Sequence, residues 1–508
     1  MGGGGRALLS CADMARADRA AQERYGIPAM ILMENAAASA ADYLLRLWGD
    51  DAPVLVVAGK GNNGGDALAI ARRLFLAGRR NLRVLLLQEE LGELPRVHCG
   101  ILERLGVPVS VYAGREGEAA RLAGEASWIL DGLYGIGLAG PVREPAAGLL
   151  RILNDSRARV VALDVPSGLG DGFRGAWPVL RADYTLAFEA PKLCLYLPLG
   201  RATAGRIVVL SAGFPPQVFE GGGPQGGSVE LADADFVLKN LLPRPRAADY
   251  KNSRGHVAVF AGSPGTTGAA LLCSGAVLRA GAGLASLFAA SDAYGVLASS
   301  CGSVMVRPRA PAPRDWDAGA FDAILAGPGW GRGQENAAWL GRFFASGLPG
   351  VLDADALHVL AGMIARETVN LQGWVLTPHP GEFAVLSGAD RDSILSDPIP
   401  LVREFCRRLR CVLVLKAHVT LIHDPGTGGD EGGTWIHDGM NPALGTAGSG
   451  DVLAGVIAGL LGRSLAPGRA ALCGVEIHAA AGRAAAGAAG FFTSEELLRY
   501  ISKEAYGK

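Results

Sequence analysis

The chain has 508 residues, with 48 lysines and arginines against 49 aspartates and glutamates, and a net charge of -1. This balance excludes the strongly basic class of nucleic-acid binders, whose affinity comes largely from neutralising phosphates. The length predicts two or three domains of roughly 150 residues each. Glycine (73 residues) is abundant beside long apolar runs, which is typical of the tight strand-to-helix turns of a soluble α/β enzyme.

The sequence gives no sign of a membrane or secreted protein. Its longest apolar runs, such as 452–461, are ten residues long, whereas a membrane-spanning helix needs about 20. No apolar segment with a cleavage site follows Met1, and the eight cysteines form no CxxC or CxxH pattern. We therefore expect a cytoplasmic protein with reduced thiols and no membrane or nucleic-acid partner. A homo-oligomer is also expected, although none of these features determines the oligomeric state.

In the first half of the chain, short apolar runs alternate with segments long enough for a helix. Buried strands are expected at 53–58, 82–87, 107–112, 128–131 and 160–164, with further β-like runs at 184–188 and 206–210. Spacers of this length suit crossover helices, so the pattern predicts a mostly parallel sheet.

A second α/β series follows a change in composition. Residues 220–228 (EGGGPQGGS) are typical of a flexible connector. Beyond them, strands are expected at 256–261, 322–326, 350–352, 374–376 and 411–416, and the alanine-rich tract 479–489 is expected to be a tightly packed helix. We therefore expect a domain over 1–220, a linker over 221–248 and a second domain over 249–508.

The first candidate site is the glycine loop at 59–66 (GKGNNGGD), between an expected strand and an expected helix. Backbone N–H groups in such a loop, together with the helix N-terminus, favour an anionic phosphate. Gly59, Gly61 and Gly64 also satisfy GxGxxG, and Glu89 could be the acidic residue of a dinucleotide fingerprint. A nicotinamide dehydrogenase therefore stays an alternative on this motif alone, as does a turn without a ligand.

Two further expected strands end on aspartate. Asp131 begins DGLYGIGLAGP and Asp164 begins DVPSG. Because ligands of open parallel sheets bind beyond the carboxyl ends of the strands, we expect both aspartates and the glycine loop to meet in one crevice. A single aspartate in this position is usually a turn or cap residue, but three strand ends behaving alike favour a site.

These motifs, GNNGGD, D-x-L-[FY]-G-x-G, D-[IV]-P-S-G and A-P-K, occur in this order between Ser10 and Pro215 and resemble the NAD(P)HX epimerase family. The resemblance implies a Rossmann-like α/β/α sandwich, a potassium ion held by Asn63, Asp131 and Ser167, and acid–base work by Asp164 with Lys192. It implies that the hydrated nicotinamide contacts Asn62, Asn63, Gly64, Gly65, Asp66, Gly135, Ile136, Gly137, Leu138, Ala139, Gly140, Pro141 and Asp164.

This copy departs from the family pattern at three places. Ala67 stands where glycine is usual, Ile136 where threonine is common, and 170–174 (GDGFR) replaces an acidic, threonine-rich stretch. These changes leave open that the first half is a binding module without epimerase activity.

The second candidate site centres on 445–451 (GTAGSGD), directly before the apolar helical run VLAGVIAGLLG. Small residues let backbone amides surround a transferring phosphoryl group at a helix N-terminus. Asp451 is placed to accept a proton from a substrate hydroxyl, and the protein's task in phosphoryl transfer is mainly positioning and charge stabilisation. No lysine follows the glycines, which excludes a Walker A loop.

Other strand ends in the second half carry polar residues. Residues 327–331 (GPGWG), 377–382 (TPHPGE) and 416–420 (KAHVT) each follow an expected strand. Asp353 and Asp355 are either site residues or caps of the next helix. His418 and His423 lack a third nearby ligand, so we expect no metal site there.

Together with KNSRGHVAVFAGSPGTTGAALL and NPALGTAGSGDVLAG, these stretches resemble the ribokinase-like superfamily and, more narrowly, the ADP-dependent NAD(P)HX dehydratases, over about 249–502. The resemblance implies a ribokinase-like α/β domain that uses ADP and Mg²⁺. It implies nucleotide contacts from Lys416, Ala417, His418, Val419, Thr420 and Gly450, and substrate contacts from Ala269, Gly329, His379 and Asp451.

The expected function is therefore the repair of hydrated nicotinamide cofactors. The first half would convert R-NAD(P)HX to the S epimer, and the second would dehydrate S-NAD(P)HX, releasing AMP and phosphate. An anion-binding loop and a base would look the same in a kinase of a small alcohol. The alternative is thus a vitamin or sugar kinase fused to a non-catalytic Rossmann-like module.

Overall fold

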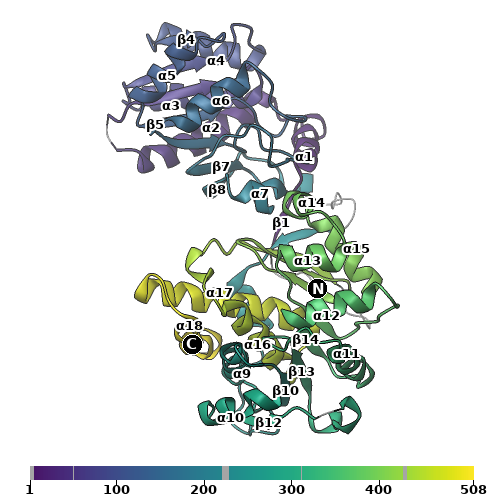
Figure 1. Cartoon of the computed structure of the whole chain (residues 1–508). Helices are drawn as coiled ribbons and strands as arrows, with labels where there is room; N and C mark the ends of the chain where they lie inside the picture. The colour runs from purple at the N-terminus through teal and green to yellow at the C-terminus, as the bar shows by residue number, and fades with distance from the viewer. Residues whose placement is uncertain (1–4, 50, 220–227, 311, 427–431, 508) are drawn as a thin grey trace. The chain divides into compact units, whose positions relative to one another are not determined.

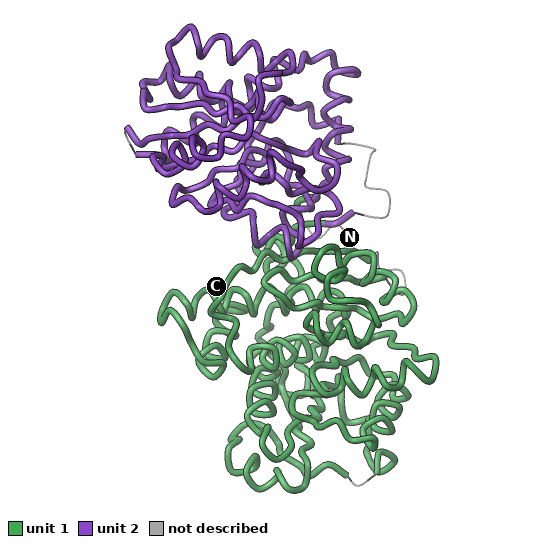
Figure 2. The backbone as a smooth tube through the Cα atoms, turned by 45° about the horizontal axis from the view of Figure 1, so that its top comes forward, with its two compact units in different colours: residues 1–6, 230–508 green, residues 7–229 purple. Residues whose placement is uncertain are grey.

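The computed structural model describes residues 5–49, 51–219, 228–310, 312–426 and 432–507. The chain forms two compact units: Ala7–Val229, here called the N-terminal unit, and Met1–Arg6 with Glu230–Lys508, here called the C-terminal unit (Figure 2). Of the expected connector at 220–228, only Ser228 belongs to the described residues. Part of the range expected as a linker is folded instead. It contains helix α8 (Ala234–Asn240), whose Val237 is buried in the core of the C-terminal unit.

The N-terminal unit contains a seven-stranded sheet with the order β4-β3-β2-β5-β6-β7-β8. All of its strand pairs are parallel, which confirms the expectation from the apolar runs. The strands are β2 (Val54–Ala58), β3 (Leu82–Leu86), β4 (Val109–Val111), β5 (Trp128–Gly132), β6 (Arg159–Leu163), β7 (Tyr184–Phe188) and β8 (Arg206–Leu210). The strand order reverses between β2 and β5, the place where open α/β sheets bind ligands.

Helices cover both faces of this sheet (Figure 1). Those that pack into its two cores are α2 (Ala29–Leu47), α3 (Asn62–Leu76), α4 (Glu93–Arg104), α5 (Glu116–Glu125) and α6 (Ala146–Asp155). The unit also contains α1 (Cys11–Glu23) and the short α7 (Pro198–Arg201). Val54 and Val56 of β2 pack with α2, α3 and α4, whereas Leu55 and Val57 pack with α5 and α6. Alternating side chains of one strand thus enter two cores, and the unit is the expected α/β/α sandwich.

The C-terminal unit is built on an eleven-stranded sheet with the order β1-β9-β18-β17-β16-β15-β14-β13-β10-β11-β12. Its strands are β10 (His256–Phe260), β11 (Leu284–Ala289), β12 (Met305–Pro308), β13 (Ala323–Ala326), β14 (Gly350–Leu352), β15 (Trp374–Leu376), β16 (Val412–Leu415), β17 (Thr420–Asp424) and β18 (Gly433–His437), with β1 (Arg6–Leu8) and β9 (Val229–Leu231) where the chain passes between the units. Strands β10 to β16 pair with one another in parallel, and β17 is antiparallel to both β16 and β18. The sequence patterns had not predicted β11, β12, β17 and β18.

One helix of this unit is buried along almost its whole length. In α16 (Ser449–Gly462), every residue from Val452 to Gly462 is buried. A Cβ on Gly455 would overlap the carbonyl oxygen of Cys273 in α9, so glycine is needed for the close approach of these helices. The other helices are α9 (Thr267–Arg279), α10 (Ser291–Ser300), α11 (Glu335–Ala345), α12 (Asp355–Ile364), α13 (Pro380–Ser387), α14 (Arg391–Ser396), α15 (Ile399–Leu409), α17 (Pro467–Ala489) and α18 (Ser494–Tyr506).

Two remaining expectations can be compared with the structure. The alanine-rich tract lies within α17, as expected, and this helix packs on α16. Only the first part of the tract is tightly packed: Ala479, Ala481, Gly482 and Ala485 are buried, whereas residues 487–489 are exposed. Among the residues that the structure describes, no helix combines the length and apolar character needed to cross a membrane.

Two candidate active sites

The N-terminal unit contains a cavity of about 540 Å³ beyond the carboxyl ends of β2 and β5. Ten of the residues implied by the family resemblance line it: Asn62, Asn63, Asp66, Gly135, Ile136, Gly137, Leu138, Ala139, Asp164 and Lys192. Gly64, Gly65, Gly140 and Pro141 are not among its lining residues. The structure thus brings most of the expected substrate contacts together in one place.

Close packing explains the glycines at the start of α3. A Cβ on Gly59 would overlap the carbonyl oxygen of Leu133, and one on Gly64 would overlap that of Gly59. The glycine loop therefore lies directly against the end of β5, and Gly64 acts through this packing rather than by facing the cavity. Ala67 is buried against Gly132, where a second Cβ would not fit. The alanine found in place of the family's glycine is therefore accommodated.

Asp131 lies buried behind the cavity at the end of β5. Its carboxylate accepts hydrogen bonds from Ser167 Oγ at 2.6 Å, Ser167 N at 2.9 Å and Leu133 N at 3.1 Å. Burial raises the pKa of Asp131 to about 6, although these hydrogen bonds act in the opposite direction. Beside it, Asn63 contacts Gly135, and its buried Nδ2 has no hydrogen-bond partner among the described residues.

Asp164 and Lys192 form a buried ion pair at the cavity wall. Asp164 follows β6 with a positive φ of 66°, a strained conformation for a non-glycine residue. Its Oδ1 accepts from Phe188 N at 3.2 Å, and Lys192 Nζ donates to the Phe188 carbonyl at 2.5 Å. The end of β7 therefore positions both members of the pair.

The cavity also contains residues that the sequence did not single out. Helix α1 contributes Met14, Asp18 and Gln22, and the loops contribute Lys60 and Tyr134. Burial raises the pKa of both Asp18 and Asp66, and the negative charge of Asp164 adds to each shift. The spacing of four residues between Met14, Asp18 and Gln22 places them on one helix face and was the available signal.

The segment at 170–174, which departs from the family pattern, supports α1. The Asp171 carboxylate accepts from the N–H groups of Cys11 and Ala12, both at 3.0 Å, at the first turn of that helix. Negative charge at a helix N-terminus is stabilising. The altered segment therefore helps to hold Asp18 at the cavity wall.

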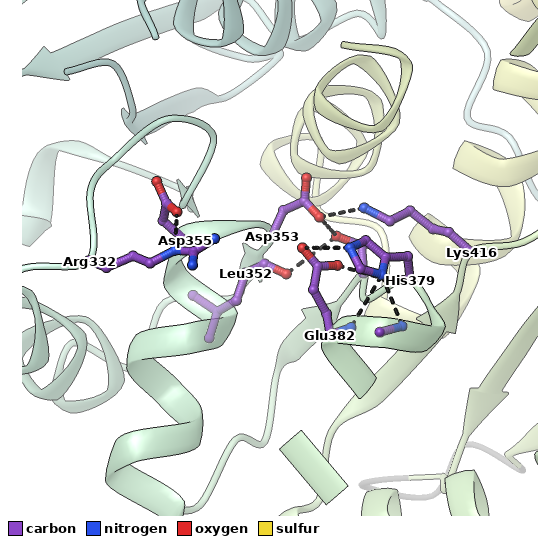
Figure 3. Close-up of polar contacts among 9 residues, drawn as sticks. Arg332, Leu352, Asp353, Asp355, His379, Glu382 and Lys416 are labelled. Carbon is purple, nitrogen blue, oxygen red and sulfur yellow. Dashed lines mark hydrogen bonds and ion pairs between the residues drawn. The ribbon is translucent and has the colours of Figure 1, made fainter. Parts of the chain in front are cut away.

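In the C-terminal unit, the candidate residues follow successive parallel strands. Asp353 follows β14, Thr377 follows β15 and Lys416 follows β16. Asp353 Oδ1 accepts from Thr377 Oγ1 at 2.8 Å and from Lys416 Nζ at 2.6 Å (Figure 3). Asp353 is therefore a member of this cluster rather than a helix cap. Asp355 binds Gly331 N and Arg332 Nε, both at 2.9 Å.

Asp451 is the third residue of α16. Burial raises its pKa to about 7, with further upward contributions from the charges of Asp353, Asp355 and Glu382, and with Lys416 opposing them. A Cβ on Gly450 would lie 3.3 Å from Lys416 Nζ, so the lysine reaches the start of α16. A carboxyl group with this pKa can accept and return a proton near neutral pH.

His379 caps α13 and also presents an exposed ring edge. Its Nδ1 accepts from Gly381 N at 3.0 Å and Glu382 N at 3.2 Å, while Glu382 Oε2 accepts from His379 N at 2.8 Å. The side chain is 58% exposed. Because Nδ1 accepts, the neutral ring carries its proton on Nε2, which lies 3.6 Å from Glu382 Oε1.

The loops that carry Ala269 and Gly329 adjoin each other. Thr266, directly before α9, donates from Oγ1 to the Gly329 carbonyl at 3.0 Å, and Ala269 lies in the first turn of α9. Gly329 has a φ of 56° and lies against Thr266, leaving no room for a side chain. Both expected substrate residues therefore lie beyond the neighbouring strands β10 and β13.

The expected nucleotide loop at 416–420 connects β16 to β17. Lys416 N donates to the Pro378 carbonyl at 2.8 Å, and the His418 carbonyl accepts from Met440 N at 3.2 Å. Val419 is buried, so its side chain cannot face a ligand, whereas Ala417 and Thr420 are partly exposed. No cluster of three or more metal-ligating His, Cys, Asp or Glu residues occurs in the described part of the chain.

Comparison with known proteins identifies the family of the chain. The family model for the YjeF-related protein N-terminus matches residues 29–194, and the model for NAD(P)H-hydrate dehydratase matches residues 257–503. The bifunctional NAD(P)H-hydrate repair enzyme of Moorella thermoacetica is 34% identical over 501 residues, covering 94% of this chain and 92% of that protein. This chain belongs to the bifunctional NAD(P)H-hydrate repair enzyme family.

Other members of the family are similarly related. The Pyrobaculum aerophilum enzyme is 34% identical and covers 97% of both chains, and the Escherichia coli enzyme is 31% identical over 92% of this chain and 88% of its own. A solved Bacillus subtilis ADP/ATP-dependent NAD(P)H-hydrate dehydratase, co-crystallised with ATP/Mg²⁺, is 25% identical over 54% of this chain and 96% of its own, with a TM-score of 0.49. Family membership over nearly the full length favours cofactor repair over the vitamin or sugar kinase.

Proposed function

We propose that this chain repairs hydrated nicotinamide cofactors with two active sites. The N-terminal cavity converts R-NAD(P)HX to S-NAD(P)HX, and the C-terminal unit dehydrates the S epimer with ADP, giving NAD(P)H, AMP and phosphate. The observation that carries this proposal is Asp451, a base with a pKa of about 7 at the N-terminus of a buried helix, beside the Asp353–Lys416 pair.

The proposed dehydration follows from leaving-group chemistry. Asp451 accepts the proton of the ring hydroxyl, and the hydroxyl oxygen attacks the β-phosphorus of ADP while the bond to AMP breaks. Hydroxide is a poor leaving group, whereas the phosphate so formed is a good one. The ring nitrogen's lone pair then expels phosphate, and loss of a proton from the neighbouring ring carbon restores NAD(P)H. Each atom of the added water is thereby accounted for.

The residues around Asp451 fit a nucleotide with Mg²⁺. The described residues form no cluster of three or more metal-ligating side chains. Mg²⁺ would therefore be held mainly by the substrate phosphates and water, with one or two of the carboxylates whose charges raise the pKa of Asp451, namely those of Asp353, Asp355 and Glu382. Bound Mg²⁺ would neutralise charge on the transferring phosphoryl group. Lys416 reaches the same region and would contact the nucleotide phosphates together with the exposed part of 416–420.

In the N-terminal cavity, we propose that Asp164 and Lys192 carry the proton transfers of epimerisation. One member protonates the ring hydroxyl, so that the lone pair of the ring nitrogen expels it as water and leaves a planar iminium carbon. The other member takes a proton from a water molecule as that water adds to the opposite face of the same carbon. Their mutual ion pair keeps both charged groups at the wall of a mainly apolar cavity. Asp66 and Asp18, with raised pKa values, would bind the substrate as hydrogen-bond partners.

Asn63, Asp131 and Ser167 fit a potassium ion. Among the described residues, Asp131 receives three hydrogen bonds but no ion pair, and Asn63 has an unpartnered buried amide nitrogen. Rotation of that amide would offer its oxygen in place of the nitrogen, giving three oxygen donors of the kind a hard cation prefers. Bound K⁺ would supply the positive charge that the buried carboxylate lacks.

The products distinguish this proposal from a kinase. With full-length protein, Mg²⁺, ADP and purified S-NADHX, phosphorus NMR should show free phosphate and AMP as NADH absorbance rises. Accumulation of a stable phosphorylated product without NADH would contradict the proposal and favour the kinase. We also propose that the enzyme works in a reducing cytoplasm, where its eight free cysteines remain thiols.

A further inference from the structure

Side chains bind three carbonyl groups at the start of α16, and two of these side chains come from other helices. The Leu444 carbonyl accepts from Ser449 Oγ at 2.7 Å, the Ala447 carbonyl from Ser494 Oγ at 2.7 Å, and the Ser449 carbonyl from His478 Nε2 at 2.9 Å. Ser494 belongs to α18 and His478 to α17. Two helices distant in sequence from the GTAGSGD motif therefore fix the direction of its peptide groups.

Several backbone N–H groups of the same loop, unlike these three carbonyl groups, lack a hydrogen-bond partner in the described part of the chain. Among the described residues, the N–H groups of Ala447, Gly448, Gly450 and Asp451 have no hydrogen-bond acceptor. Free N–H groups at a helix N-terminus bind anions, whereas a carbonyl turned toward the same point would repel them. Because side chains hold the carbonyl groups in place, the N–H groups of the loop remain free to bind the transferring phosphoryl group.

We propose that His478 is a positioning residue for phosphoryl transfer: its bond to the Ser449 carbonyl fixes the first turn of α16 and with it the amides of Gly450 and Asp451. Ser494 acts in the same way on the Ala447 carbonyl. This inference rests on the proposed dehydratase function for its catalytic consequence, but the fixing of the turn can be measured without substrate.

The chemistry of His478 suits a fixed donor. Its side chain is buried, and burial lowers its pKa to about 4, with smaller downward contributions from His437 and Lys416. The ring is therefore neutral at physiological pH. Because a carbonyl oxygen can only accept, the 2.9 Å contact requires the proton to be on Nε2.

A set of matched variants separates positioning from general stability. His478→Leu removes the donor, and His478→Gln restores an N–H at a similar distance along the side chain. His423→Leu is the control, since His423 is a partly buried histidine whose pKa is also lowered to about 4, but it contacts Gly433 and Thr434 instead of this loop. Ser494→Ala, a smaller change, tests the second helix if His478→Leu does not fold.

Hydrogen–deuterium exchange of the apoprotein measures the first turn directly. We expect His478→Leu to speed exchange in peptides covering 449–456 by tenfold or more, with little effect of His478→Gln or His423→Leu. Exchange unchanged by His478→Leu, or raised equally by the control, would overturn the inference.

Steady-state kinetics with S-NADHX and ADP measure the catalytic consequence. We expect His478→Leu to lower kcat by roughly 10- to 100-fold with little change in either KM, because the amides act mainly on the transition state, and His478→Gln to recover most of the loss. An unchanged kcat, or no recovery with glutamine, would also overturn it. If the wild-type enzyme itself gave no turnover, the proposed function would fail, and the exchange result alone would decide whether His478 fixes the turn.

Discussion

The two sites use their buried charges differently. In the N-terminal cavity, the two groups assigned to proton transfer pair with each other, since Lys192 binds Asp164. In the C-terminal site, the lysine pairs with Asp353 instead of the assigned base, and the pKa of Asp451 rises to about 7. The C-terminal site thus relies on a single buried base that can accept a proton near neutral pH, whereas the N-terminal cavity places an acidic and a basic side chain in direct contact.

The largest loss of activity is expected when Asp451, the proposed base of the C-terminal site, is replaced. Asp451→Asn should lower dehydration by at least ~10³-fold, since asparagine keeps the shape but cannot accept the hydroxyl proton. Epimer exchange, followed by chromatography of the two NADHX epimers, should be unchanged. Near-normal NADH formation by this variant would remove Asp451 from the mechanism.

Removing the carboxylate of the Asp164–Lys192 pair should lower epimer exchange by a smaller factor. Asp164→Asn should lower the epimer exchange rate by about 100-fold and leave dehydration of purified S-NADHX intact. Arg83→Met, which breaks the exposed Arg83–Glu125 pair of the same unit, is the control and should have no effect on exchange. Equal losses in the two variants would indicate damage to the unit rather than to the site.

The pH dependence should reveal the base of the C-terminal site. Asp451 is active when ionised, so kcat/KM for dehydration should fall about tenfold per pH unit below pH 7 and level off above it. Asp355→Asn removes a negative charge that raises this pKa, and the midpoint should therefore move to lower pH. A profile that is flat from pH 5 to 8 would contradict the assignment of an elevated pKa to the catalytic base.

The smallest expected effect concerns potassium in the N-terminal unit. At about ten times its Kd, K⁺ should stabilise this unit by about 1.4 kcal/mol and raise its Tm by a few degrees at pH 7.5. The folded-state pKa of Asp131 is raised to about 6, so ionisation costs stability as the pH rises from about 4 to 6, and K⁺ should offset this cost only where the carboxylate is ionised.

The potassium effect should therefore fade as the pH falls through 6 and be absent in Asp131→Asn, as scanning calorimetry with choline in place of K⁺ would show. A K⁺ effect that persists in Asp131→Asn would place the ion elsewhere.

Sequence reasoning predicted the strand ends well because parallel strands place their carboxyl ends on one edge. Asp131 and Asp164, and likewise Thr377 and Lys416, could be placed without coordinates for this reason. The β17–β18 hairpin was missed because its short strands carry little distinct periodicity.

Other features of the sites depend on long-range packing. The pairing of Asp353 with Lys416 joins residues 63 positions apart, and the side chain that binds the Ser449 carbonyl comes from 29 residues further along the chain. Local motifs identify such residues as polar but do not tell which partner each one meets. The contribution of α1 to the cavity was visible only as a four-residue spacing, which many surface helices share.

The most direct test of two cooperating activities uses full-length protein with Mg²⁺ and a mixture of R- and S-NADHX. NADH absorbance is followed with ADP, with ATP and without nucleotide, against a control for spontaneous epimerisation. We predict conversion of the whole mixture with ADP, faster than spontaneous epimerisation allows. A stop at the S fraction would contradict the epimerase assignment, and no NADH under any condition would contradict the repair function.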